Sequence, residues 1–298
     1  MAVKVRVRRG RVALLCVVVL AVAAFALAAA LHHSKPPPAP PSPKVVRVTI
    51  PEGETRWQIA QIAAREGLSG RYLAAAHSTG AAGSGADRPP AFDPAHYGAP
   101  RGTPNLEGFL FPATYELYAG APASHLVALQ LQAFEENFGR EEIHAAHLLH
   151  ITPYQMLTVA SMIEREAYLP RDRPRVAAVI YNRLRIGMPL GIDATIRYAL
   201  NDFSAPLTEA QLHTDSPYNT RTHVGLPPTP ISNPGMASID AAAHPAHVRY
   251  LYYVNGADGC GELVFSTSGA EFERNAAAYN QAVARNGGHE PRCRRRGK

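Results

Sequence analysis

Two glutamates near the end of a predicted helix are the side chains of this sequence best suited to acid–base chemistry. Glu164 and Glu166 lie in the segment Ala160-Ser-Met-Ile-Glu-Arg-Glu-Ala. At about 100° per residue they are roughly 160° apart around the helix, so they cannot act as a pair from one face. The apolar Met162 and Ile163 precede Glu166 by four and three residues and favour its protonated form. Glu166 is therefore a candidate proton donor, with a rim residue beside the apolar stripe as the alternative.

Other chemistries have little support in the sequence. It contains no Gly-x-Ser-x-Gly nucleophile motif, no phosphate-binding loop and no dinucleotide fingerprint. His144, His147 and His150 recur at helical spacing, but no carboxylate or cysteine completes a metal site, which favours a solvated helix. The same argument applies to His244 and His247. No metal and no organic cofactor is expected.

Basic residues are concentrated at the two ends of the chain. Of the 30 lysines and arginines, five fall in residues 1–11 and five in residues 291–298, where there are no acids. The remaining residues carry 20 basic and 24 acidic side chains, despite the overall charge of +6. A nucleic-acid-binding body should present a basic face, so nucleic acid is excluded as a partner. The length of 298 residues and the 46% hydrophobic content are typical of one or two globular domains.

An apolar run near the N-terminus predicts a membrane anchor. Residues 12–31 are 20 consecutive apolar residues, about the length that crosses a bilayer as a helix. The five preceding positive charges predict a cytoplasmic N-terminus and an exported remainder. A cleaved signal peptide is the alternative, but its apolar core is usually about 7–15 residues long. Six prolines in Lys35–Lys44 then predict an extended spacer within a linker at 32–45.

Capping residues and hydrophobic periodicity predict the elements that position the two glutamates. Thr152 and Gln155 form a capping box for the helix that carries them, and Asp172 is the predicted N-cap of the next helix. Thr55 and Gln58 form a second capping box, and Ser124 is a further predicted N-cap. The predicted helices are 56–66, 71–76, 124–138, 152 to near 170, 173–186 and 270–286. The predicted strands are 46–50, 250–254 and 263–265, and residues 80–105 form a predicted surface loop.

Two cysteines on the exported side could form a bridge. Cys260 lies in the predicted turn between the last two strands, and Cys293 lies among arginines beyond the last helix. Because that tail has no predicted structure, we expect at most a weak or optional disulfide. Cys16 falls within the apolar run and is expected to be a membrane-facing thiol.

From about Val48 onward the chain resembles the endolytic murein transglycosylases of bacteria. Short motifs stand in the order found in that family, and they cover most of the predicted exported part. The motifs are Leu106–Leu117 (LEGFLFPATYEL), Ala160–Ala167 (ASMIEREA), Val176–Leu184 (VAAVIYNRL), Ser216–Thr220 (SPYNT), Gly225–Pro228 (GLPP) and Ile231–Gly235 (ISNPG).

The resemblance implies roles for particular side chains. It makes Glu166 the catalytic general acid, and it makes Glu107, Glu164, Asn182 and Asp193 candidate residues lining the site. For Glu107, Asn182 and Asp193 the alternative is capping or turn bonding that only supports the fold. The sequence also departs from the family, which usually carries Gln at Gly191, Pro at Ala194, His at Leu263, His at Phe272 and Asp at Ala113.

The resemblance also implies an α+β fold class with several parts. These are a single N-terminal transmembrane helix at 12–31, a small LysM-like strand–helix subdomain with its loop at 46–105, and a larger mixed α/β catalytic domain at 106–287. Basic tails at 1–11 and 288–298 flank them. For the unit at 46–76, a packing subdomain without a glycan site is the alternative.

The function implied is that of a lytic transglycosylase of the bacterial inner membrane whose catalytic domain lies outside the cytoplasm. It would cleave the bond between N-acetylmuramic acid and N-acetylglucosamine within peptidoglycan, leave anhydro-muramic ends and terminate growing glycan strands. Its partners would be glycan strands, the membrane and cell-wall synthases. The alternatives are a hydrolytic glycosidase with the same site, and an inactive peptidoglycan-binding or scaffold protein.

Overall fold

The structure is a computed structural model that describes residues 9–33, 44–77, 92–204, 206–291 and 293. The chain divides into two units, Met1–Pro43 and Lys44–Lys298. Most of the predicted proline-rich linker, part of the predicted loop at 80–105 and most of both basic tails lie outside the described residues.

The described residues of the first unit form a helix, α1 (Arg9–His33). It covers the predicted apolar run, and side chains such as Leu14, Val17 and Phe25 are exposed. Among the helices of the described residues, we find none with the length and apolar character needed to cross a membrane.

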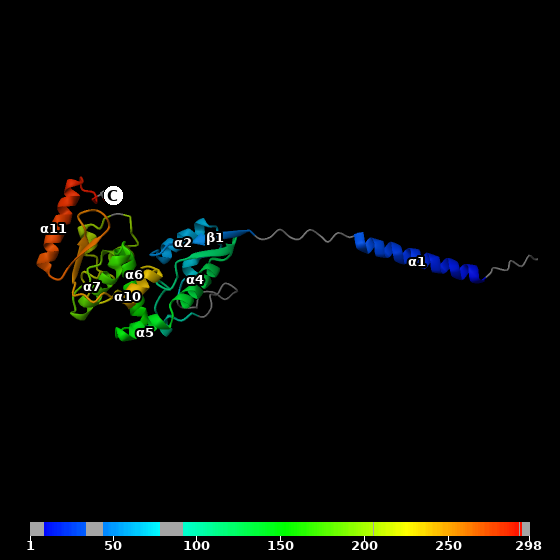
Figure 1. The fold of residues 1–298 in the computed structure, drawn as a ribbon, viewed down its shortest axis with the longest axis horizontal. Helices are drawn as coiled ribbons and strands as arrows, with labels where there is room; N and C mark the ends of the chain where they lie inside the picture. The colour runs from blue at the N-terminus through cyan, green and yellow to red at the C-terminus, as the bar shows by residue number, and fades with distance from the viewer. Residues whose placement is uncertain (1–8, 34–43, 78–91, 205, 292, 294–298) are drawn as a thin grey trace, which may run out of the picture. The chain divides into compact units, whose positions relative to one another are not determined.

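The second unit is organised around α6 (Pro153–Glu166), which carries both glutamates of the ASMIEREA motif (Figure 1). Its capping box is formed as predicted, because Thr152 Oγ1 accepts from the Gln155 N–H and Gln155 Oε1 accepts from the Thr152 N–H. Apart from Gln155, every residue from Pro153 to Ile163 is buried, so the helix is enclosed on all sides rather than on one stripe.

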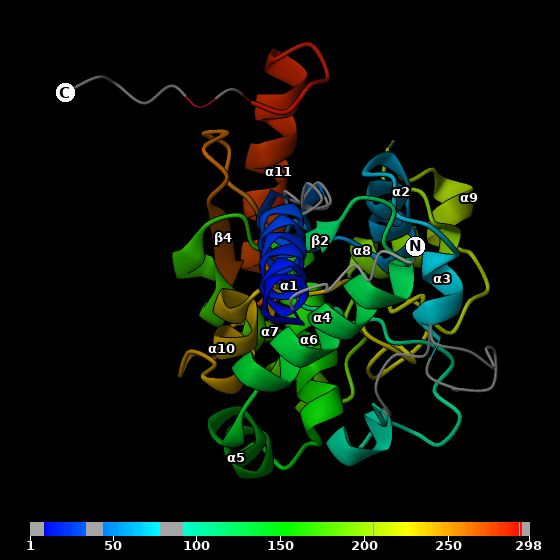
Figure 2. The ribbon, with the colours of Figure 1, turned by 90° about the vertical axis from the view of Figure 1, so that its right-hand side faces the viewer.

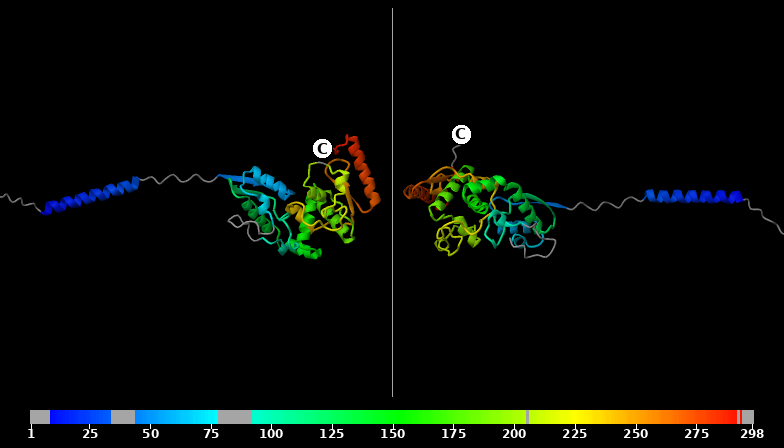
Figure 3. Two further views of the ribbon diagram at one scale, coloured as in Figure 1. Left: turned by 180° about the vertical axis from the view of Figure 1, so that it is seen from behind. Right: turned by 90° about the horizontal axis from the view of Figure 1, so that it is seen from below.

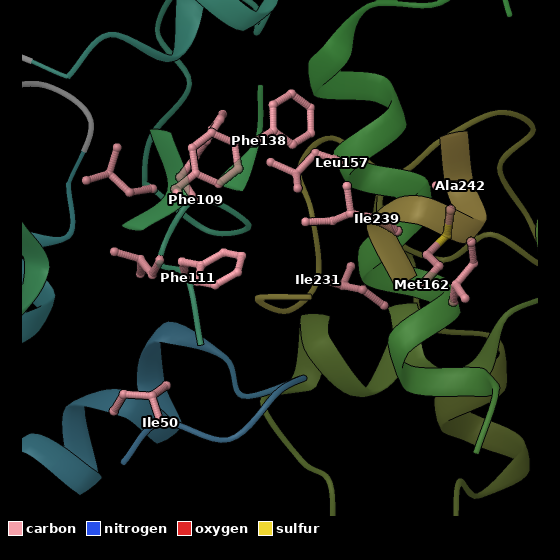
Figure 4. Packing of buried hydrophobic residues seen from close by; sticks show 14 of the residues in the cluster. Ile50, Phe109, Phe111, Phe138, Leu157, Met162, Ile231, Ile239 and Ala242 are labelled. Carbon is pink, nitrogen blue, oxygen red and sulfur yellow. The ribbon is translucent and has the colours of Figure 1, made fainter. Parts of the chain in front are cut away.

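Four helices enclose α6. They are α5 (Arg140–Leu148), α7 (Arg173–Arg185), α8 (Asp193–Leu200) and α10 (Met236–Ala243), of which α10 packs most extensively. Figure 4 shows Met162 of α6 beside Ile239 and Ala242 of α10. Short helical turns η1 (Pro94–Tyr97), η2 (Pro170–Asp172) and α9 (Glu209–Leu212) connect these elements.

A smaller module lies at one end of the second unit, opposite the end that holds the last helix (Figures 1 and 3). In it, β1 (Val45–Thr49) pairs antiparallel with β2 (Thr114–Tyr118), and α2 (Arg56–Arg65), α3 (Tyr72–Ala75) and α4 (Ala123–Asn137) complete it. The capping box of Thr55 and Gln58 is formed as predicted. The domain boundary expected at 105/106 falls between β1 and the strand with which it pairs.

At the other end, a second antiparallel pair, β3 (Tyr252–Asn255) and β4 (Leu263–Ser266), packs against α11 (Gly269–Arg285). Figure 2 shows α11 running alongside β4. With helices and two separate two-stranded antiparallel sheets among its described residues, the chain has the predicted α+β character.

The bridge that the sequence left as weak or optional is formed in the structure, where Cys260 and Cys293 are bonded to each other. After α11 the chain reverses at Gly287 and Gly288, both of which have positive φ, the conformation that glycine adopts without strain. The side-chain amide of Asn286 then donates to the carbonyl of Glu290 at 2.6 Å. These turns return the tail to the β3–β4 connection, which the sequence pattern did not predict.

Asp172 stands at the N-cap position of α7 as predicted but makes no capping bond with its side chain, and Ser124 is not the N-cap of α4. Asp172 has helical dihedral angles, because η2 runs directly into α7, and a capping side chain needs an extended residue. Its buried carboxylate instead accepts from the Leu263 N–H at 3.0 Å. Ser124 lies inside α4, whose first N–H, on Ala123, donates to the Ser69 carbonyl at 2.7 Å.

Candidate active site

A cleft of about 480 Å³ opens beside the C-terminal end of α6, where Glu166 is the last helical residue. Helices α6, α7, α8 and α11 contribute to it together with both strands of the second sheet. Its lining residues are Glu166, Arg183, Leu190, Gly191, Asp193, Arg221, Tyr252, Tyr253, Val254, Asn255, Leu263 and Phe272. Of the five site residues expected from the sequence, Glu166 and Asp193 meet in this cleft.

Glu166 lies in the cleft with two hydrogen-bond donors on its carboxylate. The Tyr253 hydroxyl donates to Oε2 at 3.0 Å, and the Ala194 N–H in the first turn of α8 donates as well. Burial raises the pKa of Glu166 to about 7, and the charge of Asp193 adds to that effect. The two hydrogen bonds and Arg165 act in the opposite direction. Near neutral pH the group can therefore both give and take a proton.

Tyr253 is the functional partner that the sequence did not reveal. Burial, followed by the nearby charge of Glu166, holds the pKa of Tyr253 well above its ordinary value, so the hydroxyl stays a donor. The sequence predicted its strand, but nothing in the pattern indicated that this strand meets the end of α6, 87 residues away in the chain.

Asp193 is the second carboxylate in the cleft, and it is held by an arginine. It is the first residue of α8, and its Oδ1 accepts from Arg221 Nε at 2.9 Å and Nη2 at 2.6 Å. Both side chains remain about half exposed, at 46% and 42%. The cleft therefore contains one partly buried carboxyl group of raised pKa and one solvated carboxylate with a cationic partner.

Arg183 ties together the walls of the cleft. From α7, its guanidinium donates to the carbonyls of Leu251, Pro189 and Leu190, the last at 2.6 Å. It also lies over the ring of Tyr252, 5.2 Å from the centroid. One side chain thus fixes the start of β3 relative to the loop that leads to α8.

Glu164 points into a different environment from Glu166. Its Oε2 accepts from the Gly235 N–H at 3.0 Å, and its Oε1 lies 3.5 Å from Arg173 Nη2. Its side chain is only 7% exposed and does not line the cleft. This agrees with the angular argument that the two glutamates occupy different sides of α6.

Glu107 is fully buried and also lies away from the cleft. Its carboxylate accepts from the Arg56 N–H at 3.1 and 3.2 Å, from Asn233 Nδ2 at 2.7 Å and from the Tyr198 hydroxyl at 3.1 Å. Burial raises the pKa of Glu107 to about 7, against the opposing effects of these bonds and the Arg56 charge. Glu107 therefore joins the start of α2 to α8 and to the ISNPG motif.

Asn182 likewise bonds to backbone rather than lining the cleft. Its side-chain amide donates to the carbonyls of Val248 and Tyr250, both at 2.9 Å. These bonds hold the segment that leads into β3, the strand that carries Tyr253.

Four of the five departures from the family pattern lie around Glu166. Gly191, Leu263 and Phe272 line the cleft, and the backbone of Ala194 bonds to the Glu166 carboxylate. Within the described residues, no group of three or more histidine, cysteine, aspartate or glutamate side chains is arranged to hold a metal ion.

Known proteins share the sequence pattern and the fold of this chain. The sequence model of the YceG-like family matches residues 22–278. The chain belongs to the YceG-like family. Its fold is similar to the crystal structure of a YceG-like protein from Listeria monocytogenes, with a TM-score of 0.66 and 30% identity over 76% of this chain and 75% of that one.

Two curated relatives of this YceG-like chain are named endolytic murein transglycosylase. The protein of Bacillus subtilis strain 168 is 37% identical over 176 residues, which are 58% of this chain and 48% of that protein. The protein of Streptococcus pneumoniae serotype 2, strain D39, is 29% identical over 253 residues, which are 80% and 46%. The chain spans about half the length of the curated relatives it matches.

Proposed function

We propose that this YceG-like chain is an endolytic murein transglycosylase that cuts peptidoglycan glycan strands with Glu166 as its general acid. The observation that carries the proposal is the Glu166 carboxyl group itself. It lies in a cleft of ligand size, its pKa is raised to about 7, and it has a neutral tyrosine donor. The name shared by the two relatives supports the same activity.

The proposed reaction needs one group that is first an acid and then a base. Protonated Glu166 gives its proton to the oxygen that leaves as the bond between N-acetylmuramic acid and N-acetylglucosamine breaks. The glutamate then takes the proton of the muramic sugar's own primary hydroxyl as that oxygen bonds to the anomeric carbon. The product is a 1,6-anhydro end, the enzyme regains its starting proton, and no water is consumed.

A hydrolytic glycosidase is the second candidate, and one observation favours it. Asp193 lies in the same cleft as Glu166, and hydrolytic enzymes use a second carboxylate as nucleophile or to activate water. Against this, Arg221 occupies Asp193 Oδ1 with two hydrogen bonds. The two reactions differ in product mass, because hydrolysis adds one water for each bond cut.

The deciding experiment is digestion of purified peptidoglycan by the full chain, followed by mass spectrometry of the fragments. We expect anhydro-muramic ends. Reducing ends that carry an added water would support the hydrolase. No cleavage would support the scaffold alternative, in which Leu263 and Phe272 at the positions of the family's histidines leave the cleft inactive.

Membrane anchoring by residues 12–31 is a further part of the proposal. It is supported by the uninterrupted apolar run and by the five basic residues that precede it. Such an anchor would hold the catalytic unit outside the cytoplasm and near cell-wall synthases. Recovery of the full chain in washed bacterial membranes tests it, with a chain lacking residues 1–43 as the control.

Glycan binding by the module of β1, α2, α3 and β2 completes the proposal. Its order of one strand, two helices and a second strand that pairs with the first supports the LysM-like interpretation. Sedimentation of the protein with insoluble peptidoglycan tests it, because a module with only a packing role would add nothing to binding.

A further inference from the structure

A second cavity, of about 290 Å³, adjoins Glu166. It shares Glu166, Asn255 and Leu263 with the main cleft, so the catalytic carboxyl group stands where the two spaces meet. The rest of its lining comes from other segments: Tyr168, which follows α6, the turn between β3 and β4, Tyr279 of α11, and Glu290 with Pro291 in the tail.

The disulfide determines where one wall of this cavity stands. Cys260 lies between Gly259 and Gly261, which both line the cavity, and Cys293 lies two residues after Pro291. The bond therefore clamps the tail against the β3–β4 turn, with 4.4 Å between the two Cα atoms. In the described part of the tail, further hydrogen bonds are local ones that join Asn286 to His289 and Glu290.

The lining of the second cavity suits a sugar ring. Tyr168 is 83% exposed, although large aromatic residues are usually more buried in a folded chain. That ring packs at the backbone of Gly261, where an added Cβ would come within 3.0 Å of it. Asn255 and Glu290 add an amide and a carboxylate that can bond hydroxyl or acetamido groups. Aromatic faces combined with such polar groups match the apolar faces and polar edges of a pyranose.

We propose that this cavity binds the sugar on the opposite side of the scissile bond from the sugar in the main cleft, and that the Cys260–Cys293 bond shapes it. The inference rests on the proposed function, because an enzyme that cuts within a strand has sugars on both sides of its acid. The volume of this cavity, about 290 Å³, is near the lower end of the range for ligand pockets, about 300 Å³, and suits one N-acetylated hexose.

Binding to a non-cleaving protein tests the subsite without relying on turnover. The full chain with Glu166→Gln is titrated with a purified peptidoglycan hexasaccharide by calorimetry. Adding Tyr168→Ala should weaken binding roughly three- to tenfold, the equivalent of one aromatic contact. Adding Tyr168→Phe instead keeps the ring and should leave the Kd nearly unchanged. Equal affinity of the Ala variant and its parent would overturn the subsite, as would the absence of any binding to the parent.

The role of the disulfide is tested in the same assay. Cys293→Ser, or mild reduction of the parent, should weaken hexasaccharide binding by a similar factor, whereas Cys16→Ser should have no effect. Unchanged binding in a Cys293→Ser protein that melts cooperatively would overturn this role. If that variant does not fold, the titration of the reduced parent decides. Failure of the wild-type chain to make anhydro-muramic ends would count against the proposed function alone, because these binding results do not depend on cleavage.

Discussion

Glu166 and Tyr253 show how a single carboxyl group is tuned. Burial beside the cleft raises the pKa of Glu166, whereas the Tyr253 hydroxyl and the Ala194 N–H stabilise its ionised form and limit the rise. A pKa of about 7 suits a group that must donate a proton and then accept one within a single reaction. Glu164, two residues earlier, is bonded to Gly235 and Arg173 and has no access to the cleft.

Replacing Glu166 with Gln should abolish strand cleavage while leaving the fold intact. The substitution keeps the size of the side chain and removes its ionisable proton, and general acid catalysis contributes about 10²- to 10⁴-fold. Because one residue would serve both proton transfers, we expect a loss at or above the upper end of that range. Rates of anhydro-muramic end formation measure it. Glu164→Gln is the matched control and should lower the cleavage rate less. A larger loss in Glu164→Gln than in Glu166→Gln would place the acid on the other side of α6.

The rate of strand cleavage should fall as pH rises through about 7, because the protonated form of Glu166 is the proton donor. Tyr253→Phe removes a bond that stabilises the carboxylate, so the fall should move to higher pH. Asp193→Asn removes a charge that raises the pKa of Glu166, so the fall should move to lower pH. Profiles of kcat/KM against pH measure these shifts. Shifts in the same direction in both variants would contradict the assigned causes.

Among the elements, α11 and the tail that follows it are joined to the second sheet by a covalent bond. The disulfide closes a loop of 33 residues that contains β4 and α11. Packing of α11 against β3 and β4 provides the other attachment. Since β3 carries Tyr253 and β4 carries Leu263, the position of this sheet decides the shape of the cleft.

Reduction of the disulfide should lower the stability of the second unit. For a loop of this length the chain-entropy model gives a contribution of about 3–4 kcal/mol, reduced by any structure that the unfolded chain retains. Thermal unfolding of the full chain with and without a reducing agent measures the change, and Cys260→Ser should reproduce it. An unchanged melting temperature would support the expectation that the bridge is weak or optional.

Local sequence signals predicted those elements whose ends are determined locally. The capping boxes at Thr55 and Thr152 formed because both partners lie within four residues. Asp172 and Ser124 looked like caps, but bonds to β4 and to the segment before α3 took precedence. The meeting of Tyr253 with Glu166 and the return of Cys293 to Cys260 depend on contacts between distant segments, which no local pattern encodes. Glu166 could be predicted as a site residue because its apolar helix neighbours and its motif are both local.

At the scale of the whole second unit, a buried polar cluster joins the small module to the helices around α6. Asn233 donates to the carbonyl of Glu54 and to Glu107, and its Oδ1 accepts from the N–H groups of Gly108 and Leu110. Its own backbone also bonds to Gly53 and Glu54. Segments from early, middle and late parts of the sequence therefore converge on one side chain.

Replacing Asn233 with Ala should destabilise the second unit strongly. The change leaves buried N–H groups and a buried carboxylate without their partner, and each such loss costs about 1–3 kcal/mol. We expect a total of roughly 2–5 kcal/mol, after partial relaxation. Denaturant unfolding measures it, and Asn137→Ala, on the exposed end of α4, serves as the control. A cost below 1 kcal/mol would mean that water replaces the lost bonds.

The position of Asn233 late in the sequence affects the order in which the protein can assemble during synthesis. The strand β1 leaves the ribosome early, but its partner β2 follows about 65 residues later and Asn233 more than 100 residues after that. Until then Glu107 has no amide from Asn233 to balance its burial. The first-made module of the second unit should therefore stay sensitive to proteases until most of the chain has been translated.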